Sequence, residues 1–267
     1  MFYAIGGILI VLAIVLIYFK RKNESKIFKI KSTKASTTSE LKELCDSVSK
    51  EIGKGAFNEY TEVKGTVRCE SPLKGELSGQ ECVYYNMQVT REWEEVYWEH
   101  DEETGNKEQK TRRGSDIVAS NTQSKDFFVE DGVGKILVRP TGAKFITIKS
   151  IDKYEPASTS SHVQVGTFSL DVSSFLSTSG SQTLGYHFEE HIISNNVRVY
   201  VLGEASDSDQ QLMIKRPKEK ENNFIISTKS EEELLTSIAK SIKVLNISSI
   251  AAAVLGIASI IYGILSK

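Results

Sequence analysis

The sequence contains few of the residues from which zinc scaffolds and disulfide frameworks are built. Its 267 residues include three cysteines and four histidines. This small number cannot ligate several zinc ions, and three cysteines without a closely spaced pair argue against a disulfide framework. The motifs G-x-S-x-G, G-x-x-x-x-G-K-[ST] and G-x-G-x-x-G are also absent. The common nucleophile and phosphate-loop signatures therefore give no support for an enzyme, and we expect no cofactor.

A strongly basic folded domain is missing as well. The net charge at pH 7 is −2, and it hides an uneven distribution. Residues 20–34 hold seven basic residues and one acidic residue, whereas the remainder of the chain is acidic. A nucleic-acid binder concentrates its basic residues on the folded domain itself. We therefore expect no nucleic-acid partner.

Two long uncharged runs stand out against an ordinary composition of 40% apolar and 25% charged residues. Residues 2–19 and 247–265 are each long enough, as helices, to cross the hydrocarbon core of a bilayer. A cleaved signal peptide is the alternative for the first run, but its basic residues follow the run and do not precede it. A buried core helix is the alternative for the second, but the run lacks the polar stripe of such a helix. We predict two transmembrane helices.

The basic residues predict the orientation of the protein. Residues 20–34 form a basic juxtamembrane segment after the first span, Lys240 and Lys243 precede the second, and only Lys267 follows it. The positive-inside rule then places residues 20–246 in the cytoplasm and both short ends outside the cell membrane. The bilayer is thus an expected partner. The basic segment can also contact anionic headgroups, although a topology signal alone explains it.

Small residues recur on one face of the second span. They are Ser248, Ala252 and Gly256, followed by Ser259 and Gly263. Such spacing lets helix backbones approach closely, so we predict that this face packs against the first span or against a second copy of the protein. The alternative is that alanine and glycine are simply common in spans.

Between the spans, a helical segment is followed by strands. Apolar residues recur at helical spacing over residues 41–52, after a cap at Thr38 or Ser39, and Cys45 beside them is expected to be packed and inert. From residue 59 the apolar residues alternate, which predicts strands. The strands are predicted within residues 59–67, 82–98, 127–149, 197–204 and 224–226.

The last helix before the second span begins with a capping box. Ser230 and Glu233 have the required spacing, and the helix is expected to continue into the span. We interpret residues 155–185, rich in Ser, Thr and Gly, as a long excursion. The predicted fold is a mainly β (α+β) domain over residues 35–246, flanked by one transmembrane helix on each side.

The most distinctive surface feature is a predicted hairpin over residues 92–113. Acidic residues on its first strand face basic residues on its second, around a turn at residues 104–106. Trp93 and Trp98 are five residues apart, so they point to opposite faces of one strand. Exposed aromatic residues commonly anchor protein partners. We therefore predict that Trp93, Tyr97 and Trp98 include the partner contacts.

One short motif suggests metal chemistry. His187 to His191 match H-x-x-E-H, the inverted zinc-protease pattern, which requires a helix. The flanking residues lead directly into a strand, and the alternative is a polar loop or short turn before that strand. Short motifs match by chance often enough that we expect no metal ligand here.

Four segments in order resemble the GIDE/MULAN family, whose membrane-side module is called the BAM domain. They are EYTEVKGTVRCESPLKGELSGQECVYYNMQV (59–89), FFVEDGVGKILVRPTGA (127–143), EEHIISNNVRVYVLGEA (189–205) and NFIISTKSEEELL (223–235). The best-known members are mitochondrial E3 ubiquitin ligases, whose activity resides in a RING domain after the second span. With the two flanking spans, the resemblance implies this architecture for nearly the whole chain.

The resemblance transfers no catalytic residue. A RING needs eight Cys and His ligands, and this chain has seven, scattered and without a C-x-x-C. With only two residues after the second span, the sequence is similar to a RING-less, prokaryotic-type member. The leading hypothesis is a membrane-anchored interaction or scaffold protein of unknown partner, with an E3-type transferase as the alternative. A zinc hydrolase using His187 and His191 is the third.

Overall fold

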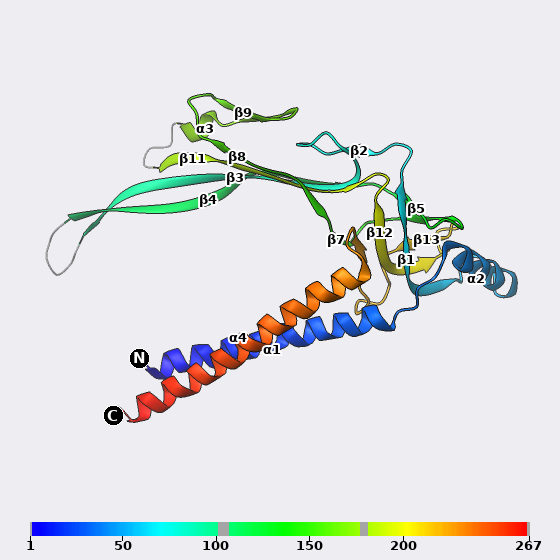
Figure 1. Ribbon diagram of the computed structural model, residues 1–267, viewed down its shortest axis with the longest axis horizontal. Coiled ribbons are helices and arrows are strands. Elements are labelled where there is room, and N and C mark those ends of the chain that lie inside the picture. The colour runs from blue at the N-terminus through cyan, green and yellow to red at the C-terminus, as the bar shows by residue number, and fades with distance from the viewer. Residues whose placement is uncertain (1, 101–106, 177–180, 266–267) are drawn as a thin grey trace.

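The computed structural model describes residues 2–100, 107–176 and 181–265, and Figure 1 shows their arrangement. The helices are α1 (Phe2–Ser32), α2 (Thr38–Glu51), α3 (Ser173–Leu176) and α4 (Glu231–Leu265). The strands are β1 (Asn58–Arg68), β2 (Leu73–Lys74), β3 (Glu81–His100), β4 (Lys107–Ser124), β5 (Phe127–Glu130), β6 (Lys135–Val138), β7 (Lys144–Ile146), β8 (Ile148–Pro156), β9 (His162–Val165), β10 (Phe168–Asp171), β11 (Ser181–Ser194), β12 (Arg198–Ser206), β13 (Met213–Lys215) and β14 (Ile225–Ser227). The predicted mainly β class with two flanking apolar helices is confirmed.

A small barrel forms the part of the domain nearest the helices. β1 pairs with β12 and β5, and the ring closes through β6 and β13. Val63 and Val67 of β1 are buried in its core, as the period-two pattern predicts. Gly65 lies between them, and a Cβ atom there would come within 2.4 Å of the Glu130 carbonyl oxygen. Glycine therefore permits the close approach of β1 and β5.

Helix α2 packs against the barrel. Leu41 and Cys45, both buried, join the same core. The N-cap is Thr37, one residue before the predicted cap, and it forms a capping box with Glu40. The sequence pattern misplaced the cap because Thr37, Thr38 and Ser39 are all good capping residues.

Two carboxylates of the barrel hold the start of α2 and the segment that follows this helix. Asp131 accepts hydrogen bonds from the backbone N–H and the hydroxyl of Thr38 at 2.7 and 2.8 Å. Asp207 accepts from the backbone N–H groups of Gly55 and Phe57 at 2.8 and 3.0 Å. Burial by itself raises both pKa values, but these hydrogen bonds outweigh it and hold the pKa of each carboxyl below its usual range.

We expect acid to release α2 before the rest of the barrel unfolds. A depressed folded-state pKa contributes stability that is complete above the unfolded pKa of about 3.9 and is lost as the pH falls through the folded value. Amide hydrogen exchange, corrected for intrinsic rates, should show α2 losing protection below about pH 4. The Asp131→Asn/Asp207→Asn variant should have a weaker α2 at pH 7 and a smaller acid effect. An equal loss of protection in the variant and the parent protein would contradict this assignment.

A second, longer sheet extends away from the barrel. Its strands are ordered β2-β3-β11-β8, with β4 on β3. Tyr85, Met87 and Val89 alternate along β3 and are buried with Phe188 of β11. The β9–β10 hairpin and α3 cover this face (Figure 1). Residues 155–185 were predicted to be a long excursion. The described part of this region instead contributes strands to the sheet and covers one of its faces.

The two long helices are antiparallel and join the domain without a linker. Both chain ends lie together at the end of the pair farthest from the barrel (Figure 1). Ile30 of α1 and Leu234 of α4 are buried with Tyr200, Leu202 and Ile225 of the barrel. Ser230 and Glu233 form the predicted capping box at the start of α4, and α4 continues into the predicted span. Both helices are long and apolar enough to cross a membrane.

Candidate functional site

The hairpin of β3 and β4 extends beyond the rest of its sheet. Among the described residues, β11 pairs with β3 only as far as Glu95. Residues 96–100 and 107–111 continue as a ribbon of two strands, which we call the arm. Each strand of the arm is about 16 Å long at roughly 3.3 Å per residue. The predicted turn at residues 104–106 lies outside the described residues.

The aromatic side chains of this hairpin lie on two faces. Trp93 is half-buried on the side that continues the core face of β3, and its ring covers Gly114 across the ladder. Trp98 is 65% exposed on the opposite side. Tyr97 shares the Trp93 side, and the guanidinium of Arg112 lies 5.9 Å from both ring centroids. Trp98 is thus the aromatic residue most available to a partner.

Opposite charges pair across the hairpin as the sequence predicts. Arg113 contacts Glu94 at 2.7 Å, Arg112 contacts Glu95 at 2.5 Å, and Lys110 contacts Glu99. These pairs are exposed, so each stabilises the ribbon only slightly. Two-stranded ribbons are marginally stable alone. The arm therefore depends on cross-strand contacts, and it presents Trp98 outside any core.

The H-x-x-E-H motif lies on a strand. All five residues belong to β11, so the expectation of a loop or turn was wrong, and the helix required for a zinc protease is not formed. His187 and His191 share the more exposed face, about 13 Å apart at four strand steps. Glu190 is fully buried and accepts hydrogen bonds from the backbone N–H groups of Leu77 and Ser78 at 2.7 and 3.1 Å. Its role is structural.

One group of potential metal ligands includes His187. The ligand atoms of Asp152, His187 and Glu189 lie within 4.8 Å of one another. Lys149 already occupies the space between the carboxylates, with its ammonium 2.9 Å from Asp152 and 2.6 Å from Glu189. His187 Nε2 lies 2.6 Å from Asp152. This is a surface ion-pair network, and it does not support a zinc hydrolase.

Two of the three cysteines are unsuited to nucleophilic chemistry. Cys45 and Cys82 are buried, and Cys69 is half-buried. Burial raises the pKa of Cys45, and burial together with the charge of Glu190 raises the pKa of Cys82 to about 11. A raised pKa keeps both thiols protonated and unreactive at neutral pH.

The small residues of the second span lie largely against α1. Ala252, Gly256 and Gly263 are buried in the helix pair, and Ser259 donates a hydrogen bond to the Phe2 carbonyl at 3.0 Å. Ser248 instead faces outward.

The buried position beside Ser248 belongs to Ser249, which is 4% exposed. A Cβ atom at Gly6 of α1 would come within 2.8 Å of the Gly256 carbonyl. The first span lies against much of this stripe, and packing against a second copy stays a prediction. Along a packed helix, the positions that face a neighbour are separated by steps of both three and four residues. A pattern that counts only steps of four therefore selects Ser248 and misses Ser249.

Comparison with known families agrees with this architecture. A family model, GIDE, described as E3 Ubiquitin ligase, matches residues 95–261, more than half of the chain. The chain belongs to the GIDE family. The match begins in β3 and ends in α4, so it includes the arm, most of the barrel and most of the second long helix. No curated protein and no solved structure matches the chain.

Three of the four segments that carry the predicted resemblance lie inside the region matched by the GIDE model, and residues 59–89 precede it. Within the region matched by the GIDE model, Gly203 of β12 lies where a Cβ atom would come within 3.0 Å of Ile214 and Phe224. The barrel closes tightly at that point, so a side chain would separate its strands.

Proposed function

We propose that this GIDE-family protein is a membrane-anchored interaction protein whose arm binds a protein partner. The observation that carries the proposal is Trp98, a large aromatic residue 65% exposed on a ribbon that projects from its sheet. Tyr97 and Arg112 lie on the opposite face of the hairpin, so Trp98 is the aromatic anchor of its own face. Trp, Tyr and Arg are the residues most enriched where binding energy concentrates in protein interfaces.

The direction of the arm favours a partner close to the membrane. The arm and the helix pair leave the barrel toward the same side (Figure 1). The arm carries several charged residues, which are excluded from the hydrocarbon core. If the helix pair anchors the protein, the arm lies on the side of the domain that faces the bilayer, where a partner close to the membrane would be reached (Figure 1).

A pair of tryptophan variants tests the arm. Trp98→Ala should change the free energy of unfolding by less than about 0.5 kcal/mol, because the side chain is exposed, and should abolish partner capture. Trp93→Ala should cost about 1–3 kcal/mol, less than the 3–5 kcal/mol of a fully buried aromatic residue, because Trp93 is half-buried. The measurements are thermal unfolding in detergent and crosslinked pull-down from the native membrane.

The two variants also separate binding from folding. Partner capture that survives Trp98→Ala would contradict a role of the arm in binding. Equal destabilisation by both changes would mean that the outer face of the strand is also part of a core. Gln123→Ala, at an exposed position of β4 outside the arm, is the matched control and should alter neither measurement.

The proposed orientation is that residues 20–246 face the cytoplasm. The basic residues of segment 20–34 and Lys240 and Lys243 support it through the positive-inside rule. In a cysteine-free background, a cysteine at exposed Ser124 should stay unlabelled by an impermeant maleimide in intact cells and react after lysis. A cysteine added before Met1 is the control and should react in intact cells. Labelling at Ser124 from outside would overturn the orientation.

An E3-type transfer activity is the second candidate, and the family model described as E3 Ubiquitin ligase favours it. The seven cysteines and histidines of this sequence are too few for the eight ligands of a RING. Transfer would therefore require a partner that supplies the catalytic module. Ubiquitin transfer from an E2 by the purified chain alone would instead establish a transferase site within these residues.

A further inference from the structure

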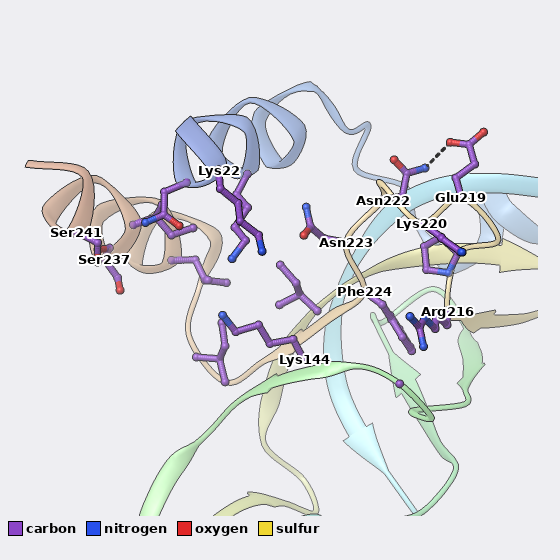
Figure 2. Close-up of a pocket in the computed structure, with 18 of the residues that line it drawn as sticks. Lys22, Lys144, Arg216, Glu219, Lys220, Asn222, Asn223, Phe224, Ser237 and Ser241 are labelled. Carbon is purple, nitrogen blue, oxygen red and sulfur yellow. Dashed lines mark hydrogen bonds between the residues drawn. The ribbon is translucent and has the colours of Figure 1, made fainter. Parts of the chain in front are cut away.

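A cavity of about 640 Å³ lies where the helix pair meets the barrel. Lys22 and Lys26 of α1 form one wall, and Ser237 and Ser241 of α4 form another. β7 contributes Lys144, and the segment before β14 closes the remaining side (Figure 2). The cavity is therefore built from four parts of the chain that meet only in the folded structure.

The lining is strongly basic. Six basic residues and one acidic residue, Glu219, surround the cavity. The basic residues are Lys22, Lys26, Lys144, Arg216, Lys218 and Lys220. In the part of the chain that the structure describes, no carboxylate lies within 4.0 Å of any of these six charged groups. Glu219 accepts a hydrogen bond from the Asn222 side chain at 3.0 Å instead.

The cations are crowded as well as unpaired. Lys22 and Lys144 point toward the same space from α1 and β7 (Figure 2). Partial burial, followed by the charges of Lys144 and Lys22, lowers the pKa of Lys26. Crowded like charges that no acidic side chain neutralises are unfavourable in the empty cavity. A bound anion would remove this repulsion.

The cavity opens at the depth of lipid headgroups. Lys22 lies three residues past Phe19, the end of the apolar run, and Lys26 lies seven past it. At 1.5 Å per residue these positions are about 4.5 and 10 Å beyond the hydrocarbon boundary. The headgroup region on each side of a bilayer is roughly 5–7 Å thick. Basic pockets beside transmembrane helices at this depth suit phosphorylated headgroups.

We propose that this cavity binds a phosphate-bearing polyanion, supplied as the headgroup of an anionic lipid. The lysines and Arg216 neutralise its phosphates, and the amide group of Asn223 and the hydroxyl of Ser237 offer neutral hydrogen bonds. The lipid source rests on the proposed membrane anchoring, because only a bilayer-spanning pair brings headgroups to the cavity.

The test uses the purified full chain in detergent with two probes that share one headgroup. The probes are dioctanoyl phosphatidylinositol 4,5-bisphosphate and free inositol 1,4,5-trisphosphate, and the readouts are binding and the midpoint of thermal unfolding. We expect the short-chain lipid to bind and to raise the midpoint. Lys26→Gln/Lys144→Gln should lower its affinity at least tenfold. Without any probe this variant should unfold at the same or a higher temperature, because repulsion is relieved.

The matched control removes two positive charges outside the cavity. Lys31 and Lys34 are exposed and do not line it, so Lys31→Gln/Lys34→Gln should change the affinity less than twofold. A lipid that binds tenfold more tightly than the free headgroup supports the lipid source. Equal affinities support the phosphate site with a soluble ligand. Failure of both probes to bind, or an equal loss in the control variant, overturns the site.

The binding measurement in detergent does not require that the chain is anchored in a membrane, whereas the proposed lipid source does. A chain that alkaline carbonate removes from native membranes would refute the proposed anchoring and, with it, the lipid source. A chain that stays in the membrane but binds neither phosphorylated probe would refute the site alone.

Discussion

Ile30→Ala should cost about 2–5 kcal/mol of the free energy of unfolding, the range for truncating a fully buried aliphatic residue. Ile30 is 0% exposed although it belongs to a helix whose N-terminal part is a predicted span. It packs with Leu234, Tyr200, Leu202 and Ile225, the cluster that joins both long helices to the barrel. The truncation leaves a cavity at that junction, so the helices should loosen from the domain.

The control for Ile30 lies two residues earlier on the same helix. Phe28 is larger but 72% exposed, so Phe28→Ala should change the stability by less than about 0.5 kcal/mol. Thermal unfolding in detergent measures both changes, and hydrogen exchange of β12 and β14 locates them. If Phe28→Ala proved the more damaging change, the helices would be attached to the domain by another surface.

Glu190→Ala should be comparably destabilising. The change leaves the N–H groups of Leu77 and Ser78 without their acceptor, at about 1–3 kcal/mol for the buried Leu77 donor and less for the partly buried Ser78 donor. The Ser150 hydroxyl also loses its contact with the carboxylate, 2.9 Å away. Glu190→Gln should cost less, because the amide keeps one acceptor oxygen.

The neighbouring glutamate separates a structural role from a metal-binding role. Glu189→Gln removes an exposed ion pair with Lys149 and should cost less than about 1 kcal/mol. Chemical denaturation in detergent compares these variants, and metal analysis of His187→Ala/His191→Ala accompanies it. Stoichiometric zinc that is lost in the double variant would restore the metal-site interpretation. Equal costs at Glu189 and Glu190 would contradict the buried role of Glu190.

The H-x-x-E-H motif shows where a sequence pattern fails. The same four-residue spacing places two side chains on one face of a helix or on one face of a strand. The spacing of His187 and His191 therefore does not decide between them. Pairing with β3 and β8 makes the segment a strand, and only that pairing shows Glu190 to be buried against the turn at Leu77 and Ser78.

Local chemistry was sufficient for several of the elements. The uncharged runs 2–19 and 247–265, the alternation in β1 and β12, the capping box at Ser230 and the charged hairpin follow from side-chain periodicity and turn residues, which act over a few positions. The mainly β class and the two apolar helices were therefore predictable. So was the resemblance to the GIDE family, because its strand and turn patterns are local as well.

Tertiary structure alone decided what these elements build. Barrel closure between β1 and β12, the packing of Ile30 beneath β14 and the exposure of Trp98 depend on contacts between residues far apart in the sequence. The basic cavity is the clearest case. The sequence of segment 20–34 indicates a topology signal, but folding brings Lys26 of that segment beside Lys144. Periodicity reports which face of an element is apolar, whereas the element that covers this face is fixed only when the whole chain packs.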